Sequence, residues 1–259
     1  MIKYEFRRAF GKTFFFAVAI GILSGISGIY VYHLDTQWNE LSEISCYDAW
    51  LYCFSVSESS IYRAIFPLLV CLPYLQKFYS DRNSTLIYSI ITRTSYLRFY
   101  LSKIFVGIIS STSVVVLVLG FWFVVSICFY PANLPVTIFN YSPGGAFSEY
   151  YAYQPLKYII IILFLNIISG NLIYLVGIAL SYFAKNRNQV LVMPNMIYLF
   201  LILISQIGTL SFLDPVVLIA PLEATRLTFS HIAFCWLIIL IASLVSLFSF
   251  YQADRKEIL

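Results

Sequence analysis

The chain has 259 residues, of which 61% are hydrophobic and only 11% are charged, and its mean hydropathy is +0.85. Soluble domains carry about 25% charged residues, so a soluble protein of this size could not bury this much apolar surface, and lipid is the expected solvent. The formal net charge of +4 does not indicate a nucleic-acid partner, because the basic residues gather beside the ends of apolar stretches.

Residues 1–12 predict a short amphipathic helix. Their apolar side chains recur at helical spacing, and Lys3, Arg7 and Arg8 project away from that stripe. Such a helix lies in the headgroup region of a membrane, with its basic side chains facing anionic lipid. Alternatively, these charges only anchor the apolar stretch that follows.

Six apolar stretches are each long enough to cross a bilayer, which takes about 20 mostly apolar residues. They cover residues 12–33, 61–78, 104–130, 157–183, 189–210 and 231–251. Pro67 and Pro73 fall inside the second stretch and predict a bend there. The expected fold is therefore an all-α polytopic membrane protein, with six transmembrane helices in a single domain over residues 1–259.

The distribution of basic residues predicts the orientation of these spans. An even number of spans puts both termini on the same side. If that side is the cytoplasm, all but three of the 16 Lys and Arg lie on inner segments, the exceptions being Arg63, Lys157 and Arg226. Because such a bias sets membrane topology, we expect cytoplasmic termini in a multi-pass protein of a cell membrane, specifically a bacterial plasma membrane.

Two external segments carry further signals. The aromatic residues of the first external loop, residues 33–60, predict a short interfacial helix. Cys46 and Cys53 share this loop and are either disulfide-bonded or free. Residues 212–230 are broken by prolines but keep an apolar patch, so we expect a re-entrant or interfacial segment, with an ordinary external loop as the alternative.

Polar and small residues inside the spans point to helix contacts. The notable polar side chains are Asn166, Asn171, Asn195 and Gln206. These side chains either line a translocation path or hydrogen-bond neighbouring helices, and packing is the more common role. Gly21, Gly25 and Gly28 allow close approach of another helix to the first span, from the same chain or from a second copy.

Residues 76–103 form the most informative inner segment. They hold five basic residues against one acid, Asp81, and residues 86–91 and 96–101 predict two short amphipathic helices along the inner face. Ser84 is a plausible N-cap of the first helix. An exposed element with charged ends and an apolar middle suits docking of another protein, whereas the alternative is a basic loop held on anionic lipid.

The order of residues in this segment resembles the cytoplasmic coupling segment of type-2 ATP-binding-cassette (ABC-2) exporter permeases. The pattern is an acidic residue and Arg, Ser/Thr-Leu, a short apolar run, Thr-Arg, and a Lys opening the third span. The matching residues are Asp81, Arg82, Thr85, Leu86, Thr92, Arg93 and Lys103. The family usually has Gly-Thr before the Leu and often Glu at the acidic position, whereas here Ser84 replaces that Gly.

The resemblance implies a permease that pairs with a second permease subunit, as a homodimer or heterodimer, and binds a separate ABC ATPase through this segment. ATP and Mg²⁺ would be held by that partner, and closure of the ATPase dimer would push on the coupling helices and tilt the spans. The aromatic content suits a peptide, lipid-like or other amphipathic cargo, and it suits plain lipid contact equally well.

Enzyme chemistry is not expected in this chain. Gly11, Lys12 and Thr13 match the end of a phosphate-binding loop, but Phe6 stands where its first Gly belongs and no strand precedes it. The sequence has no metal-ligand spacing, and no bound cofactor or catalytic residue is expected. The span interiors hold almost no ionisable residues, which argues against an ion-coupled carrier, while a non-transporting sensor or structural subunit stays an alternative.

Overall fold

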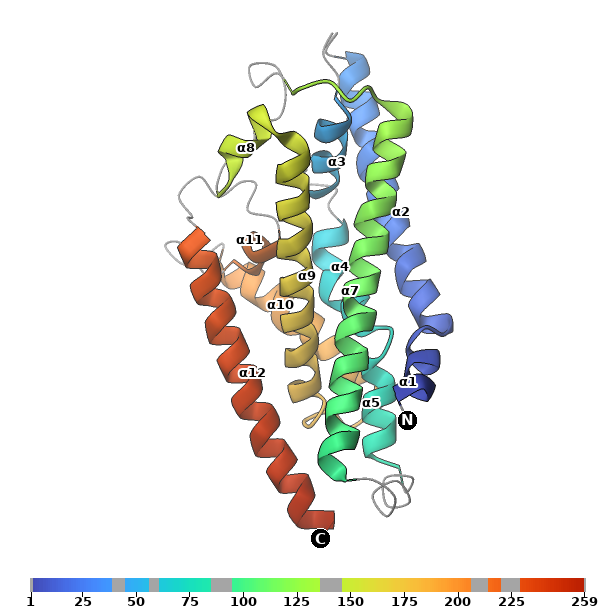
Figure 1. Cartoon of the computed structure of the whole chain (residues 1–259), viewed down its shortest axis with the longest axis vertical. Coiled ribbons are helices and arrows are strands. Elements are labelled where there is room, and N and C mark those ends of the chain that lie inside the picture. The colour runs from blue at the N-terminus through green and yellow to red at the C-terminus, as the bar shows by residue number, and fades with distance from the viewer. Residues whose placement is uncertain are drawn as a thin grey trace.

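The computed structural model of the chain describes residues 2–38, 45–55, 61–84, 95–135, 146–205, 214–219 and 229–258. Every regular element in these ranges is a helix (Figure 1). Five helices are long and apolar enough to cross a membrane: α2 (Lys12–Trp38), α7 (Tyr96–Phe129), α9 (Pro155–Leu180), α10 (Arg187–Ser205) and α12 (Phe229–Ile258). Their lengths and compositions are those of an all-α multi-pass membrane protein, as the sequence predicts.

The second predicted span is two short helices instead of one. Helix α4 (Ile61–Cys71) and helix α5 (Leu75–Arg82) are separated by a turn over residues 72–74 that contains Pro73. Proline has no backbone N–H to donate, and its ring clashes with the carbonyl four residues earlier, so the helix stops there. The expected bend is therefore a complete break between two helices, and a sixth spanning segment made of α4 and α5 together stays a prediction.

A separate amphipathic helix precedes the first span, as predicted. Helix α1 (Ile2–Ala9) is joined to α2 by Phe10 and Gly11, and it packs beside the beginning of α7. Glu5 and Ala9 face the protein interior, whereas Lys3 and Arg7 are exposed. The N-terminus and the C-terminus lie at the same end of the molecule, the lower end in Figure 1.

The helix expected in the first external loop is present but buried. Helix α3 (Cys46–Ser55) packs against α2 and α7, and Trp50 and Phe54 have no exposed surface. The Trp50 indole donates a hydrogen bond to the carbonyl of Leu119 at 3.0 Å, so these aromatic rings belong to the core and not to a membrane interface. Cys46 and Cys53 are free thiols, because seven residues along one helix separate them by about 10 Å, too far for a disulfide.

The small residues of the first span contact helices of the same chain. A Cβ atom at Gly25 would lie 1.8 Å from the Trp122 ring, and one at Gly28 would lie 2.8 Å from Cys53 of α3. Helices α2 and α7 therefore approach closely along this stripe. On its other side α7 packs against α9, and α9 packs against α12. The sequence left open whether this stripe contacts a helix of the same chain or of a second copy, and in the structure it contacts helices of the same chain.

Two short helices lie toward the opposite end from the termini. Helix α8 (Ser148–Tyr153) leads into α9, and helix α11 (Pro215–Ile219) packs against α9. Ser169 donates to the carbonyl of Leu218 at 2.6 Å, and the Trp236 indole donates to the Ser169 hydroxyl at 3.0 Å. Because Ser169 lies more than three turns into α9, α11 is inserted among the helices and does not lie over their ends (Figure 1).

Candidate functional site

Four ionisable side chains from three helices meet at the end of the molecule where the termini lie. Glu5 and Arg8 are three residues apart on α1, so they share one face of that helix. Asp81 stands in the last turn of α5, and Lys103 stands two turns into α7. We call these four residues the charge cluster.

The cluster is closely paired. Arg8 donates two hydrogen bonds to the Asp81 carboxylate, from Nη1 to Oδ2 at 2.6 Å and from Nη2 to Oδ1 at 2.9 Å. The Lys103 ammonium donates to Glu5 Oε1 at 3.0 Å and also to Asp81 Oδ2. Bidentate arginine–carboxylate pairs are among the strongest hydrogen bonds in proteins, and the two positive and two negative charges cancel.

Two further side chains hold the cluster in place. The Tyr74 hydroxyl donates to Glu5 Oε2 at 2.6 Å. The Lys77 ammonium donates to the Thr13 hydroxyl at 3.0 Å, to the Pro73 carbonyl at 3.1 Å and to the Arg8 carbonyl. The turn that interrupts the second predicted span is therefore bonded to the corner between α1 and α2.

Burial makes the cluster depend on its internal partners. The side chains of Lys103, Glu5 and Asp81 are 1%, 5% and 12% exposed, and that of Arg8 is 28% exposed. Burial opposes ionisation of Asp81, but hydrogen bonds from Arg8 and Lys103 outweigh it and hold its pKa below the ordinary value. The hydrogen bond to Asp81 raises the pKa of Arg8. Both groups are thus charged at neutral pH, which suits a structural link and not a proton donor or acceptor.

Two members of the charge cluster, Asp81 and Lys103, lie at the two ends of the predicted coupling segment. Asp81 precedes residues 85–94 and Lys103 follows them, and the two side chains are ion-paired to each other. Four of the predicted coupling residues lie outside the described residues: Thr85, Leu86, Thr92 and Arg93. Residues 96–101, expected to form a short separate helix, are instead the first turns of α7, which continues unbroken into its span.

Arg82 is described, and it links the segment to α12. Its guanidinium carbon lies 3.5 Å from the centroid of the Tyr182 ring, a cation–π contact. The Tyr182 ring in turn stacks on Phe250 of α12, with centroids 3.9 Å apart. On the other flank, Tyr96 stacks on Tyr251 at 5.3 Å. One border of the coupling segment therefore contacts the last helix directly through Tyr96, and the other border reaches it through Tyr182.

The turn between α9 and α10 also reaches α5. This turn covers residues 181–186, and it overlaps the connection between the predicted spans 157–183 and 189–210. Arg187 donates to the Ser80 hydroxyl at 2.7 Å, and the Tyr79 hydroxyl donates to the Ala184 carbonyl at 3.3 Å. Together with the charge cluster, these contacts connect α5 to α1, α7, α10 and α12 at one end of the molecule.

The predicted polar span residues lie apart from the cluster. Asn166 is fully buried, donates to the carbonyls of Ile162 and Ile219 at 2.8 Å each, and accepts from the Tyr62 hydroxyl at 3.4 Å. Asn171 donates to the Thr112 hydroxyl at 3.0 Å. These are the contacts of helix packing, and a role in a translocation path stays a prediction.

The remaining two predicted polar residues are Asn195 and Gln206. The Asn195 Oδ1 atom is buried without a hydrogen-bond partner among the described residues, and Gln206 lies outside them. A cavity of about 130 Å³ lies beside Ser169, between α9, α10, α11 and α12, and Leu172, Tyr198 and Trp236 help to line it. Small-molecule sites occupy about 300–1,000 Å³, so this cavity is narrow for a cargo.

Sequence reasoning missed Glu5, Arg8, Tyr74 and Lys77 as members of the site. A signal was present for one of them, Glu5, and for its partner Lys103, which is also among the residues that match the coupling segment. Glu5 is the one acid in residues 1–12, and Lys103 is a cation within an apolar helix. Because an isolated buried charge is costly, each predicts an oppositely charged partner, although the sequence does not say which.

Comparison of the chain with protein-family models, curated proteins and solved structures gives no match. Within the described ranges no group of three His, Cys, Asp or Glu side chains could hold a metal ion. The class of protein is therefore assigned from the chain itself. This chain is an all-α multi-pass membrane protein with a paired charge cluster at the end where its termini lie.

Proposed function

We propose that this chain is the membrane-spanning permease subunit of an ABC exporter in a cell membrane, with cytoplasmic termini and a separate ATPase as its partner. The observation that supports this best is the ion pair between Asp81 and Lys103. It joins the two ends of the segment that resembles an ABC-2 coupling segment. A partner docked on that segment would act on a stretch of chain whose two ends, Asp81 and Lys103, are joined to each other and to the membrane helices.

The contacts at the two ends of the segment offer a route by which the ATPase stroke could reach the membrane helices. Asp81 and Lys103 bind Arg8 and Glu5, so a push on the segment moves α1, α5 and α7 together. Arg82 passes part of the same displacement to α12 through Tyr182 and Phe250. Packed elements with such connections move as bodies, by sliding or hinge motion, and do not deform locally.

Transport in this proposal requires partners. The ATPase supplies ATP and Mg²⁺, and a second permease subunit, identical or related, completes the translocation path. The 130 Å³ cavity within one copy supports a path that forms between two subunits or opens during the stroke. A peptide, lipid-like or other amphipathic molecule is the proposed cargo.

Co-purification tests the proposal. The tagged chain is purified from its native membranes in mild detergent, and an ABC ATPase subunit, recognised in the co-purified proteins by its phosphate-binding loop, is quantified by mass spectrometry. Replacing both Leu86 and Arg93 with Asp is expected to remove the ATPase. Replacing Lys3 and Arg7, two exposed cations at the same end, with Asp is the matched control and should retain it.

The outcome is decisive when both variants elute as monodisperse protein. Absence of any ABC ATPase from the wild-type preparation contradicts the proposal. Retention of the ATPase after the Leu86 and Arg93 changes contradicts the assigned docking segment.

A further inference from the structure

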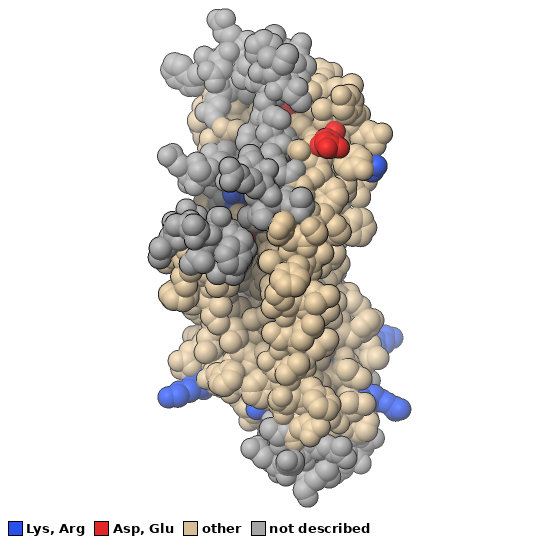
Figure 2. Space-filling view, turned by 90° about the vertical axis from the view of Figure 1, so that its left-hand side faces the viewer, with Lys and Arg blue, Asp and Glu red and all other residues tan. Residues whose placement is uncertain are grey.

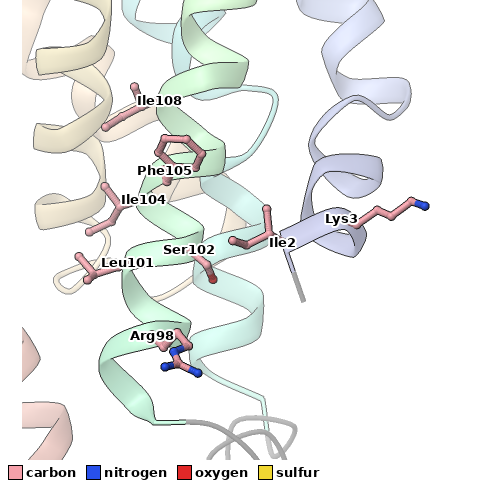
Figure 3. A pocket seen from close by; sticks show the side chains of 8 residues that line it. All are labelled: Ile2, Lys3, Arg98, Leu101, Ser102, Ile104, Phe105 and Ile108. Carbon is pink, nitrogen blue, oxygen red and sulfur yellow. The ribbon is translucent and has the colours of Figure 1, made fainter.

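A groove lies between α1 and the first turns of α7, and its volume is about 940 Å³. Figure 3 shows its lining side chains. Ile2 points from α1 toward Ser102, while Leu101, Ile104, Phe105 and Ile108 follow the length of α7. The volume is at the upper end of the range of ligand sites, about 300–1,000 Å³.

The groove is apolar along one part and cationic at one end. Arg98 is exposed and lies at the lower end of the groove in Figure 3. Lys3 borders the groove from α1, although its ammonium extends to the far side of that helix (Figure 3). An anionic head with an apolar tail would match this polarity.

The surroundings of the groove are positive. Of the acidic side chains that the structure describes at this end, Glu5 and Asp81 are both buried in the charge cluster. The exposed charges described there are all cations: Lys3, Arg7, Lys12, Arg98, Lys185 and Arg187. Figure 2 shows Lys and Arg around this lower end of the molecule. The charge cluster thus keeps Glu5 and Asp81 away from the surface, and the exposed charges among the side chains described at this end attract anions.

The groove also crosses the expected edge of the hydrocarbon. With a rise of 1.5 Å per residue, Arg98 and Ile108 are about 15 Å apart along α7. The apolar stretch begins at residue 104, so Arg98 lies about 9 Å on its polar side and Ile108 lies inside it. A phospholipid has this same order of charge and hydrocarbon along the membrane normal, and basic pockets at helix ends bind acidic headgroups.

We propose that this groove binds one anionic phospholipid, with its phosphate on Arg98 and an acyl chain along Leu101, Phe105 and Ile108. The lipid would contact α1 and α7 together, beside the charge cluster that joins them. This inference rests on the membrane character of the chain and on the groove, and it does not depend on a transport function.

Native mass spectrometry of the detergent-purified chain tests the site. The wild-type chain is titrated with phosphatidylglycerol and, separately, with phosphatidylcholine of the same acyl chains. We expect a distinct one-lipid adduct that favours phosphatidylglycerol. Arg98→Glu should weaken that adduct by at least about fivefold and weaken the phosphatidylcholine adduct less, because reversing a basic charge acts most strongly on a lipid with a net negative charge.

Two further variants separate the groove from general attraction. Arg187→Glu makes the same charge change outside the groove and should stay within about twofold of the wild type. Leu101→Trp fills the groove at an exposed position without changing charge and should also lose the adduct. If Arg98→Glu fails to fold, the Leu101→Trp result decides.

Three results would overturn the inference. Equal binding of the two lipids by the wild-type chain removes the preference for an anionic head. Equal losses of the phosphatidylglycerol adduct in Arg98→Glu and Arg187→Glu show that the lipid is attracted to the basic surface in general and not to the groove. A two-chain species that dissociates on Leu101→Trp substitution shows that a second copy of the chain occupies the groove.

Discussion

The guanidinium of Arg8 donates two hydrogen bonds, at 2.6 and 2.9 Å, to the carboxylate of Asp81, which lies 73 residues later in the chain. This pair connects the N-terminal helix to the border of the segment proposed to bind an ATPase. Because Lys103 bonds to the same carboxylate and to Glu5, α1, α5 and α7 share one network. A helix that the sequence places on the membrane surface is therefore part of the site.

Removing Asp81 should destabilise the chain. Asp81→Ala leaves Arg8 and Lys103 without one of their carboxylates, and breaking a buried ion pair in this way costs about 3 kcal/mol. A lower midpoint of thermal unfolding in detergent would measure the loss. Arg7→Ala, at an exposed position on the same helix as Arg8, should change stability by less than about 0.5 kcal/mol. Equal losses of stability in the two variants would show that the ion pairs of Asp81 do not stabilise the chain.

Acid should weaken the same link. Because the pKa of Asp81 is lower in the folded chain than its ordinary value of 3.8, its stabilisation is complete above that value and is lost as the pH falls through the folded-state pKa. Between about pH 5 and pH 3, wild-type unfolding midpoints should therefore fall more steeply than those of Asp81→Asn. Parallel acid profiles for the two proteins would assign the acid sensitivity to other carboxyl groups.

Lys103 and Glu5 should be energetically coupled. Lys103→Met and Glu5→Gln each remove one side of a pair with an N–O distance of 3.0 Å, so after either change the second change has no contact of that pair left to remove. A double-mutant cycle in denaturant unfolding is expected to give a coupling energy of about 1–3 kcal/mol. Additive losses, within about 0.5 kcal/mol, would contradict direct pairing.

The close approach of α2 and α7 can be tested with one methyl group. Gly25→Ala places a Cβ atom 1.8 Å from the Trp122 ring, which is fully buried against Phe54 and Tyr62, so overpacking should cost about 1–3 kcal/mol. Gly120→Ala is the control, because no atom lies within 4 Å of its added Cβ.

In the control, the higher helix propensity of alanine should stabilise α7 by up to about 1 kcal/mol. Unfolding midpoints of both variants measure the difference. A neutral Gly25→Ala would mean that α2 and α7 do not pack through this stripe.

The long apolar helices were predictable because their signal is local. A run of about 20 apolar residues needs no knowledge of its neighbours, so α2, α7, α9, α10 and α12 all lie close to their predicted ranges. The break at Pro73 was harder to predict, because a proline within a membrane helix gives either a bend or a complete stop.

The partners within the fold were not predictable, because they depend on contacts between distant residues. Trp50 fits a membrane interface equally well until its indole is seen to donate to Leu119, 69 residues away. Asp81 and Lys103 were recognised from the order of residues, but their bonds to Arg8 and Glu5 require α1 to fold back beside α7. The role of α1 therefore comes from the structure alone.

Reconstitution tests the central claim most directly. The purified chain is placed in vesicles with ATP and a fluorescent amphipathic peptide, once alone and once with its co-purified ATPase. The account predicts that peptide accumulates only when ATPase and ATP are both present, and that the double substitution of Leu86 and Arg93 by Asp abolishes this accumulation. Sustained accumulation by the chain alone, without any ATPase, would contradict the account.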